Sequence, residues 1–197
     1  MKTRSHRITA FAMTVLSGIA IYCFFALKYP YHLHFQEQYQ LFEFTWDYFS
    51  SVSCVPGGLA DWTGRFLTQF CYYAPAGATL IAILLCSVQL LSFAACSSKN
   101  LTTYALSFLP VIPLLAFYCD ENALLGGTAA IAISLAAFAL CRLIRPGRVR
   151  LLTEAALIPV LYMACGSLSV VFLLVAIISE CLESKAKALS VRSAPLR

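Results

Sequence analysis

Long runs of apolar residues, separated by short polar segments, make up most of the chain. Runs almost free of charge cover residues 8–27, 76–95, 101–118 and 124–143, and a fifth apolar stretch covers residues 151–182. Each is near or above the roughly 18 residues that indicate a membrane-spanning helix. The pattern predicts an all-α protein, a polytopic transmembrane helix bundle that forms a single membrane domain over residues 1–197.

The fifth apolar stretch leaves the number of spans open. It contains 32 residues, which is long for one span and short for two, and Ala164-Cys165-Gly166-Ser167 lies near its middle. One long tilted helix would leave the basic tail, residues 184–197, outside the cell. Two short spans hinged near Gly166 would return the tail to the cytoplasm, so the count is five or six.

Two local features refine the spans. Pro110 and Pro113 are expected to kink the third span, because proline lacks the backbone N–H of a helical hydrogen bond. The sequence LLGGTAA at the start of the fourth span provides small residues for close helix packing.

The distribution of charge predicts the orientation of the chain. Basic residues gather in the N-terminal arm, at Lys99, in residues 142–150 and from Lys185 onward. By the positive-inside rule these segments face the cytoplasm, and the first span is a retained signal anchor. The loop of residues 29–75 and the turn at Asp120 are then external. The net charge of +5 is a topology signal, so we expect the lipid bilayer and no nucleic acid as a partner.

The external loop, residues 29–75, is rich in aromatic residues. Two segments place apolar side chains at helical spacing, one before and one after a Pro56-Gly57-Gly58 turn. Such stripes are typical of amphipathic helices at the membrane interface. The first predicted helix covers residues 36–50, and the two stripes consist of Phe35, Tyr39, Phe42, Trp46 and Phe49, followed by Leu59, Trp62, Phe66, Leu67 and Phe70.

Polar residues of the second interfacial helix form a candidate binding face. Asp61, Arg65 and Gln69 follow one another at a spacing of four, so they share one side of a helix. Either Asp61 and Arg65 form a solvated ion pair, or Asp61 holds Arg65 in position to bind an anionic group.

Two acidic loops supply the candidate catalytic residues. Glu37 follows the first span, next to Gln38 and close to His34. A partly buried carboxylate there would have a raised pKa and could act as a general base. Asp120 and Glu121 lie in the short loop between the third and fourth spans, on the same predicted side. The two loops could converge on one cavity that activates an acceptor hydroxyl or holds a divalent cation. Alternatively, Glu37 is simply solvated and the sequence YCDEN caps a tight hairpin.

The nine cysteines show no metal-ligand spacing. Cys54, Cys71 and Cys119 lie on the predicted external side, where one disulfide could form. Unpaired structural cysteines are favoured over that bridge.

The sequence EQYQLFEF, followed by DYF and then by PGGLADWTGRFLTQFCYYAPAGA, resembles an uncharacterised family of multi-pass inner-membrane proteins of Bacteroidota, a domain of unknown function. The resemblance covers the external loop and its flanking spans closely and the later spans in pattern. Members of that family usually continue well beyond 197 residues, so the chain is expected to be a short version or an N-terminal piece.

More distantly, the layout is similar to the C-superfamily of membrane glycosyltransferases, which use polyprenyl-phosphate-linked sugars. The resemblance implies an essential acid after the first span, at Glu37, and a second acidic position at Asp120 or Glu121. It also implies a substrate-binding region, in which Arg65 would meet the lipid phosphate and His34, Gln38 and Gln69 would line the site. The short second loop and the missing further spans depart from the pattern of that superfamily.

We therefore expect a membrane protein with a glycosyltransferase-like core that transfers a sugar from a polyprenyl-phosphate donor at the periplasmic face. The alternative is a non-catalytic membrane module that binds lipid or a partner membrane protein through its aromatic interfacial helices. A transporter is disfavoured, because Gln89 is the main polar feature that the predicted spans present.

Overall fold

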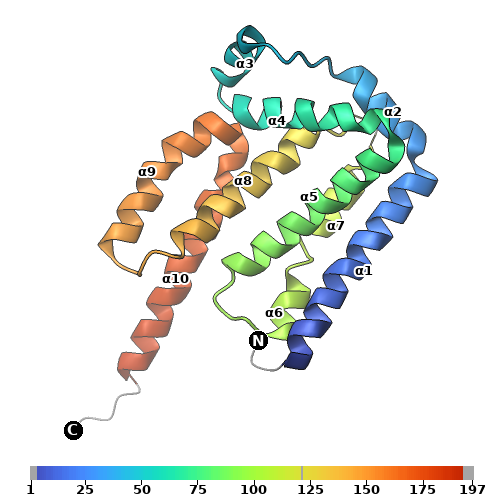
Figure 1. The fold of residues 1–197 in the computed structure, drawn as a ribbon. Helices are drawn as coiled ribbons and strands as arrows, with labels where there is room; N and C mark the ends of the chain where they lie inside the picture. The colour runs from blue at the N-terminus through green and yellow to red at the C-terminus, as the bar shows by residue number, and fades with distance from the viewer. Residues whose placement is uncertain (1–3, 121, 193–197) are drawn as a thin grey trace.

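Helices make up the fold of the chain. The computed structural model describes residues 4–120 and 122–192, and within these ranges it contains no β-strand. Figure 1 shows the long helices running between two ends of the molecule, with shorter helices lying across one end. The predicted all-α class is confirmed. The long segments are α1 (Arg4–Lys28), α5 (Ala74–Ala95), α6 (Leu101–Leu106) with α7 (Val111–Phe117), α8 (Leu125–Cys141), α9 (Arg148–Cys165) and α10 (Val170–Arg192).

Several of these segments have the length and composition of membrane spans. Three helical segments, Arg4–Lys28, Ala74–Ala95 and Arg148–Lys185, are long and apolar enough to cross a membrane. Two shorter apolar segments cover Leu101–Phe117 and Leu125–Cys141. The observed bounds follow the five predicted apolar stretches closely.

The last apolar stretch is a hinged pair of helices. Gly166 has φ 61°, a left-handed conformation that glycine adopts without steric cost, and a 3-10 turn, η2 (Gly166–Ser169), follows it. Near the start of α9, Arg150 forms an ion pair of 2.9 Å with Glu183, near the end of α10. This contact requires the two helices to be antiparallel, as Figure 1 shows. Of the two alternatives left open by the sequence, the structure contains the pair, which gives six helical segments.

Four short helices form a cap across the end of the bundle that lies opposite the start of α1 (Figure 1). We use the word cap for residues 30–72 and the term basic end for the opposite end, with loops 96–100 and 142–147. The turn between α9 and α10 lies at the cap side. The cap helices are α2 (Pro30–Tyr39), α3 (Trp46–Ser53), α4 (Gly58–Thr68) and η1 (Gln69–Tyr72).

A buried polar network ties three segments together where the third apolar run breaks. Helix α6 ends before Pro110, and Ser107 donates a 2.6 Å hydrogen bond to the Tyr104 carbonyl. Gln89, which is fully buried in α5, donates to Ser107 Oγ at 2.8 Å and accepts from Thr14 of α1 at 3.0 Å. The predicted kink is therefore a complete break, and side chains satisfy the backbone there.

Candidate functional site

Glycines position α4 directly on the bundle. A Cβ atom on Gly64 would lie 2.2 Å from the backbone nitrogen of Gly126, the second residue of α8. A Cβ on Gly58 would lie 1.9 Å from the Val52 carbonyl oxygen. The two backbones can approach this closely only because both positions lack a side chain. The small residues of LLGGTAA do mediate close packing, as predicted, and their partner is the cap helix α4.

A second backbone contact joins the cap to the turn between α9 and α10. Gly57 has φ 86° and donates a 2.9 Å hydrogen bond from its N–H to the Met163 carbonyl. A Cβ on Gly57 would lie 3.3 Å from Gly166. The PGG turn of the cap and the Gly166 turn therefore fix one another, which sets the height of α4 above the bundle.

The segment before α4 is not the single helix that the sequence predicted. Helix α2 ends at Tyr39, residues 40–44 are not helical, and α3 begins at Trp46. Thr45 is the N-cap of α3, and its side chain accepts a 3.3 Å hydrogen bond from the Tyr48 N–H. A threonine at this position favours a helix start, and this capping signal outweighs the helical spacing of the aromatic residues.

We call residues 40–45, between α2 and α3, the linker. The aromatic side chains of the cap pack on one another across it. Phe42 lies 5.4 Å from Trp62 and 5.6 Å from Phe66, measured between ring centroids. Trp62 also packs edge-on against Phe49 at 5.3 Å. The predicted stripe of α4 therefore packs mainly against the linker and α3, and the rings form one aromatic cluster.

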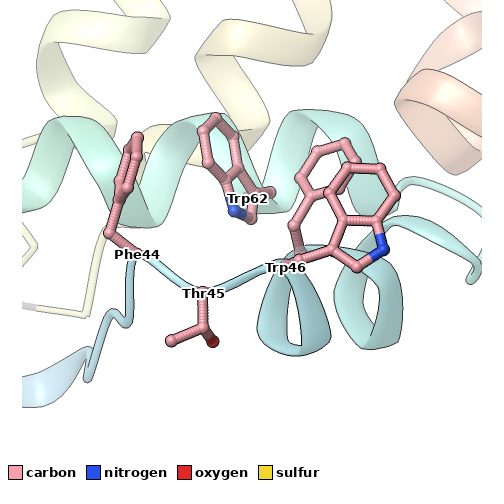
Figure 2. A pocket seen from close by; sticks show the side chains of 5 residues that line it. Phe44, Thr45, Trp46 and Trp62 are labelled. Carbon is pink, nitrogen blue, oxygen red and sulfur yellow. The ribbon is translucent and has the colours of Figure 1, made fainter.

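A hollow of about 200 Å³ opens in this cluster (Figure 2). Trp46 and Phe44 are largely exposed, whereas the Nε1 atom of Trp62 is buried and has no hydrogen-bond partner. An indole N–H is a donor that is rarely left unpaired when buried. The hollow thus combines aromatic walls with one donor that lacks an acceptor. We call it the aromatic pocket; it is lined by Phe44, Thr45, Trp46, Phe49 and Trp62.

Arg65 and Asp61 form an ion pair, which both alternatives left open by the sequence contain. The Nε and Nη2 atoms of Arg65 lie 3.0 and 2.9 Å from Asp61 Oδ2, and its Nη1 donates to the Tyr48 hydroxyl at 3.2 Å. The hydrogen bond with Asp61 raises the pKa of Arg65, although burial opposes this shift. About a third of the Arg65 side chain remains exposed. The guanidinium is therefore a fixed, permanently charged group at the surface of the cap.

The remaining polar residues on this face of α4 bind the linker. Gln69 donates from Nε2 to the Gln40 carbonyl at 3.2 Å, and Thr68 donates to Gln40 Oε1 at 3.2 Å. The shared face of Asp61, Arg65 and Gln69 thus holds the segment between α2 and α3. The Gln69 side chain therefore helps to hold this segment in place.

On α2, the predicted site residues differ in their surroundings. His34 and Gln38 are exposed, whereas Glu37 is half-buried. The charge of Glu37 reaches Cys71 in η1: burial raises the pKa of Cys71 to about 12, and Glu37 adds to that shift. Glu37 is therefore close enough to η1 for its charge to act on Cys71.

Two neighbours of Glu37 on α2 hold buried polar atoms without partners. These atoms are His32 Nε2 and Gln36 Oε1, and the Gln36 side chain is almost completely buried. Sequence reasoning did not select these residues, although His32 and Gln36 are spaced four apart beside Glu37.

The second acidic loop has a local structural role. Asp120 is exposed and its Oδ1 accepts hydrogen bonds of 2.9 and 3.3 Å from Asn122. Leu124, not Asp120 or Asn122, is the N-cap of α8. Glu121 lies outside the described residues. Among the residues that are described, no group of three or more His, Cys, Asp and Glu side chains could hold a metal ion.

All nine cysteines are described, and all are free thiols. The favoured prediction of unpaired cysteines is thus confirmed. Both Cys54 and Cys71 lie in the cap, where Cys54 is exposed and Cys71 is completely buried.

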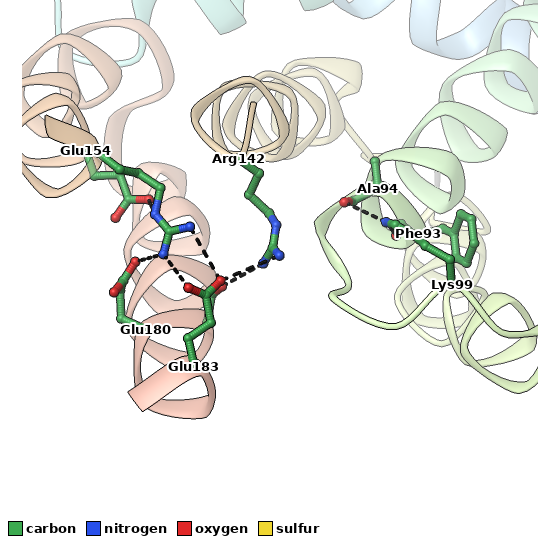
Figure 3. Close-up of polar contacts among 9 residues, drawn as sticks. Phe93, Ala94, Lys99, Arg142, Glu154, Glu180 and Glu183 are labelled. Carbon is green, nitrogen blue, oxygen red and sulfur yellow. Dashed lines mark hydrogen bonds and ion pairs between the residues drawn. The ribbon is translucent and has the colours of Figure 1, made fainter. Parts of the chain in front are cut away.

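From the sequence, the basic residues of 142–150 were used only to predict orientation, and the ion pairs that Figure 3 shows at the basic end were missed. Arg150 is buried and forms ion pairs with Glu154 at 3.6 Å and Glu183 at 2.9 Å, and with Glu180. Arg142 lies 3.6 Å from Glu183. We call these five residues the ion network. The spacing of four between Arg150 and Glu154, and the two glutamates near the end of an apolar run, were the signals available in the sequence.

Comparison with known families identifies the chain at the level of a family. A family of unknown function, DUF6057, matches residues 5–196. The chain belongs to this family. Comparisons with curated proteins and with solved structures give no match. The predicted membership of an uncharacterised family is confirmed, and kinship with glycosyltransferases stays a prediction.

In this DUF6057 chain, glycines fix the position of the cap helix α4. Gly57 and Gly64 permit its contacts with the bundle, and Gly58 permits its contact with α3. Trp62 and Arg65 both lie on α4, so the aromatic pocket and the fixed guanidinium share a helix that cannot shift without a backbone clash.

Proposed function

We propose that this DUF6057 protein is a six-span membrane protein that binds the sugar of a polyprenyl-phosphate-linked donor at its cap. The lengths and apolar composition of its helical segments support insertion in a bilayer. The basic loops 96–100 and 142–147 lie at the same end as the start of α1, which supports a cytoplasmic basic end. The cap then faces the periplasm of a bacterial inner membrane.

The observation that carries the proposal is the aromatic pocket with its unpaired Trp62 N–H. The C–H faces of a sugar ring pack on aromatic rings, and a sugar hydroxyl accepts a hydrogen bond from an indole N–H. At about 200 Å³, the pocket is smaller than the roughly 300–1,000 Å³ of pockets that bury a whole drug-sized ligand. It suits a single ring at the end of a longer amphiphile.

Arg65 is the proposed contact for the lipid phosphate. Its side chain is partly exposed, and Asp61 and Tyr48 already fix its orientation. A guanidinium presents five N–H donors, so it can hold a carboxylate on one edge and retain donors for a phosphate oxygen.

Glu37 is the proposed general base for transfer, assisted by Asp120 or Glu121. Its half-buried position on α2, close to η1, supports this role. Neither Glu37 nor Asp120 lines the aromatic pocket, so an acceptor would have to bridge the two. His34 and Gln38, both exposed on α2, remain candidates for contacts with that acceptor.

Intrinsic fluorescence tests the sugar-binding part directly, because both tryptophans of the chain line the aromatic pocket. The protein in lipid nanodiscs is titrated with a short-chain polyprenyl-phosphate hexose, and tryptophan quenching gives the dissociation constant. Trp62→Phe keeps an aromatic ring and removes the N–H, so affinity should fall about tenfold. Tyr72→Phe, an exposed change outside the pocket, should leave affinity unchanged.

Comparison ligands decide between sugar binding and lipid binding. The same polyprenyl phosphate without the hexose should bind more weakly, and equal affinity would remove the role of the sugar. For the transfer step, Glu37→Gln should abolish turnover of the lipid-linked sugar while membrane insertion and quenching persist. Glu43→Gln is the matched control, and equal turnover in Glu37→Gln would exclude a catalytic role.

A non-catalytic module is the second candidate, and one observation favours it. Leu41, Phe44 and Trp46 are 87%, 82% and 76% exposed along the linker and the start of α3. An apolar edge of this kind would bind lipid or a partner membrane protein at the membrane surface. Quenching by lipid without sugar, combined with no turnover, would establish this candidate in place of transfer.

A further inference from the structure

A groove of about 430 Å³ opens at the basic end, far from the cap. It lies between the end of α5 with its following loop, the start of α6, and helices α8 and α10. Hydroxyl groups line its mouth: Ser92 of α5, Ser97 and Ser98 of the loop, Thr103 of α6 and Ser179 of α10. The cap and the aromatic pocket share no residue with it.

The other wall of the groove is apolar and continues onto the outer surface. Val175, Ile178 and Leu182 follow one face of α10, and Leu135 of α8 lies behind them. Ile178 and Leu182 are 57% and 59% exposed. The groove is therefore open along its apolar side, where a flexible hydrocarbon chain could enter from the surrounding bilayer.

Two cations, Arg142 and Lys99, contact residues at this end of the molecule, and Figure 3 shows both. Arg142 donates a 2.8 Å hydrogen bond to the Oγ of Ser179, which lines the groove, so its guanidinium lies next to the mouth. Lys99 follows the loop serines and donates to the carbonyls of Phe93 and Ala94 at the end of α5, at 2.7 and 2.9 Å. The helix end thus fixes the Lys99 ammonium beside the mouth.

The charge of Arg142 acts on Lys99. Burial lowers the pKa of Lys99 most, Cys96 opposes this shift, and the positive charge of Arg142 adds a smaller lowering. An anion between them would relieve this repulsion. Glu183 lies 3.6 Å from Arg142 and is engaged in the ion network with Arg150.

We propose that this groove binds one anionic phospholipid from the bilayer leaflet at the basic end. An acyl chain lies along the α10 face formed by Val175, Ile178 and Leu182. The phosphate lies between Lys99 and Arg142, with the serine and threonine hydroxyls as further donors. The inference rests on the proposed membrane insertion and is independent of sugar binding at the cap.

The structure favours a phospholipid over a free phosphate ion because the apolar wall would give a free ion no contact. Basic pockets between membrane helices on the cytoplasmic side are suited to anionic headgroups, with an effect of about 1 kcal/mol per nearby Lys or Arg. Removing both cations should therefore weaken binding by roughly twentyfold or more.

Native mass spectrometry of the full-length protein, purified in mild detergent, provides the test. The probes are phosphatidylglycerol, phosphatidylcholine and inorganic phosphate, each added separately. Wild-type protein should retain one phosphatidylglycerol in preference to phosphatidylcholine, and that lipid should raise the melting temperature. The double variant Lys99→Gln with Arg142→Gln should lose this preference, whereas Arg145→Gln, an exposed charge of the neighbouring loop, should keep it.

A second pair of variants tests the acyl-chain wall without changing charge. Ile178→Trp would fill the groove at an exposed position and should displace the lipid. Ile177→Trp is the matched control, since Ile177 is 58% exposed and does not line the groove. Equal retention in these two variants would overturn the inference, as would equal retention of both lipids or equal stabilisation by inorganic phosphate.

Loss of the protein from the membrane fraction would overturn membrane insertion itself. A normal Trp62-dependent fluorescence response with no preference between the lipids would overturn this inference alone.

Discussion

The cap and the basic end differ in how their buried polar groups are paired. In the ion network, Arg150 meets three glutamates, and its charge is balanced within the hairpin of α9 and α10. In the cap, the buried atoms Trp62 Nε1 and Gln36 Oε1 have no hydrogen-bond partner. A buried polar group without a partner costs roughly 1–3 kcal/mol. At the basic end, Arg150 Nε also lacks a hydrogen bond, but the Glu154 carboxylate lies 3.6 Å from it. The comparison teaches that nearby opposite charges stabilise one end, whereas the cap retains hydrogen-bonding capacity for a ligand.

The ion network should show the largest effect on stability. Replacing Arg150 by Met leaves three glutamates near one another without their shared cation, and we expect a loss of about 3–5 kcal/mol in the free energy of unfolding. Denaturant titration in detergent micelles measures it. Arg148→Met, an exposed change two residues away, should have little effect.

A double-mutant cycle shows whether the cost of Arg150→Met comes from unpaired carboxylates. Adding Glu183→Gln to Arg150→Met should recover part of the lost stability, because it removes one uncompensated charge. If the double variant is as unstable as the sum of the single variants predicts, charge pairing is not what stabilises this end.

Disturbing the contact between the cap and the bundle should have the next largest effect on stability. Gly64→Ala places a Cβ atom 2.2 Å from the Gly126 nitrogen, so backbone must move, at a cost of about 2–3 kcal/mol. Tryptophan emission should shift to longer wavelength as the aromatic cluster loosens. Gly127→Ala is the control, because its Cβ would meet only the Leu168 side chain at 3.7 Å; an equal loss there would show that helix glycines are generally intolerant of change.

Removing a hydrogen bond that holds Arg65 should have a smaller effect on stability. Tyr48→Phe removes the acceptor of the 3.2 Å hydrogen bond from Arg65 and the 3.1 Å donation to the Leu41 carbonyl. We expect a loss of about 1 kcal/mol in the free energy of unfolding and weaker binding of polyprenyl phosphate. Tyr31→Phe, at an 87% exposed position, should match wild type. Unchanged phosphate binding in Tyr48→Phe would mean that the orientation of Arg65 is not used.

The sequence predicted the apolar helices well, because their periodicity and length are properties of single segments. It placed α5 and α8 within a few residues and expected Asp61 and Arg65 on one face. It could not choose between one helix and two for residues 151–182, because the choice depends on contacts between distant residues. The hydrogen bond from Gly57 to Met163 is one such contact, and the pairing of Arg150 with Glu183 is another.

The candidate site was predicted only in part, for the same reason. The aromatic stripe was visible in the sequence, but the pocket exists because the chain leaves the helix at Gln40 and starts again at Trp46. That break depends on the Thr45 cap and on bonds from Thr68 and Gln69 to Gln40. Spacing alone gave no information on which face the linker would cover.

The smallest effect concerns Glu37 and tests whether its charge is directed into the cap. Glu37 contributes to the raised pKa of Cys71, after burial. Removing its charge in Glu37→Gln should therefore lower the pKa of Cys71 and increase the thiolate fraction at any pH below the pKa. In a background where Cys71 is the only cysteine, alkylation between pH 8 and 10 should become a few-fold faster, because the thiolate is the reactive form. Glu43→Gln, on the exposed linker, should leave the rate unchanged. Equal rates in the two variants would place the Glu37 carboxylate in solvent and remove the structural support for its role as a base.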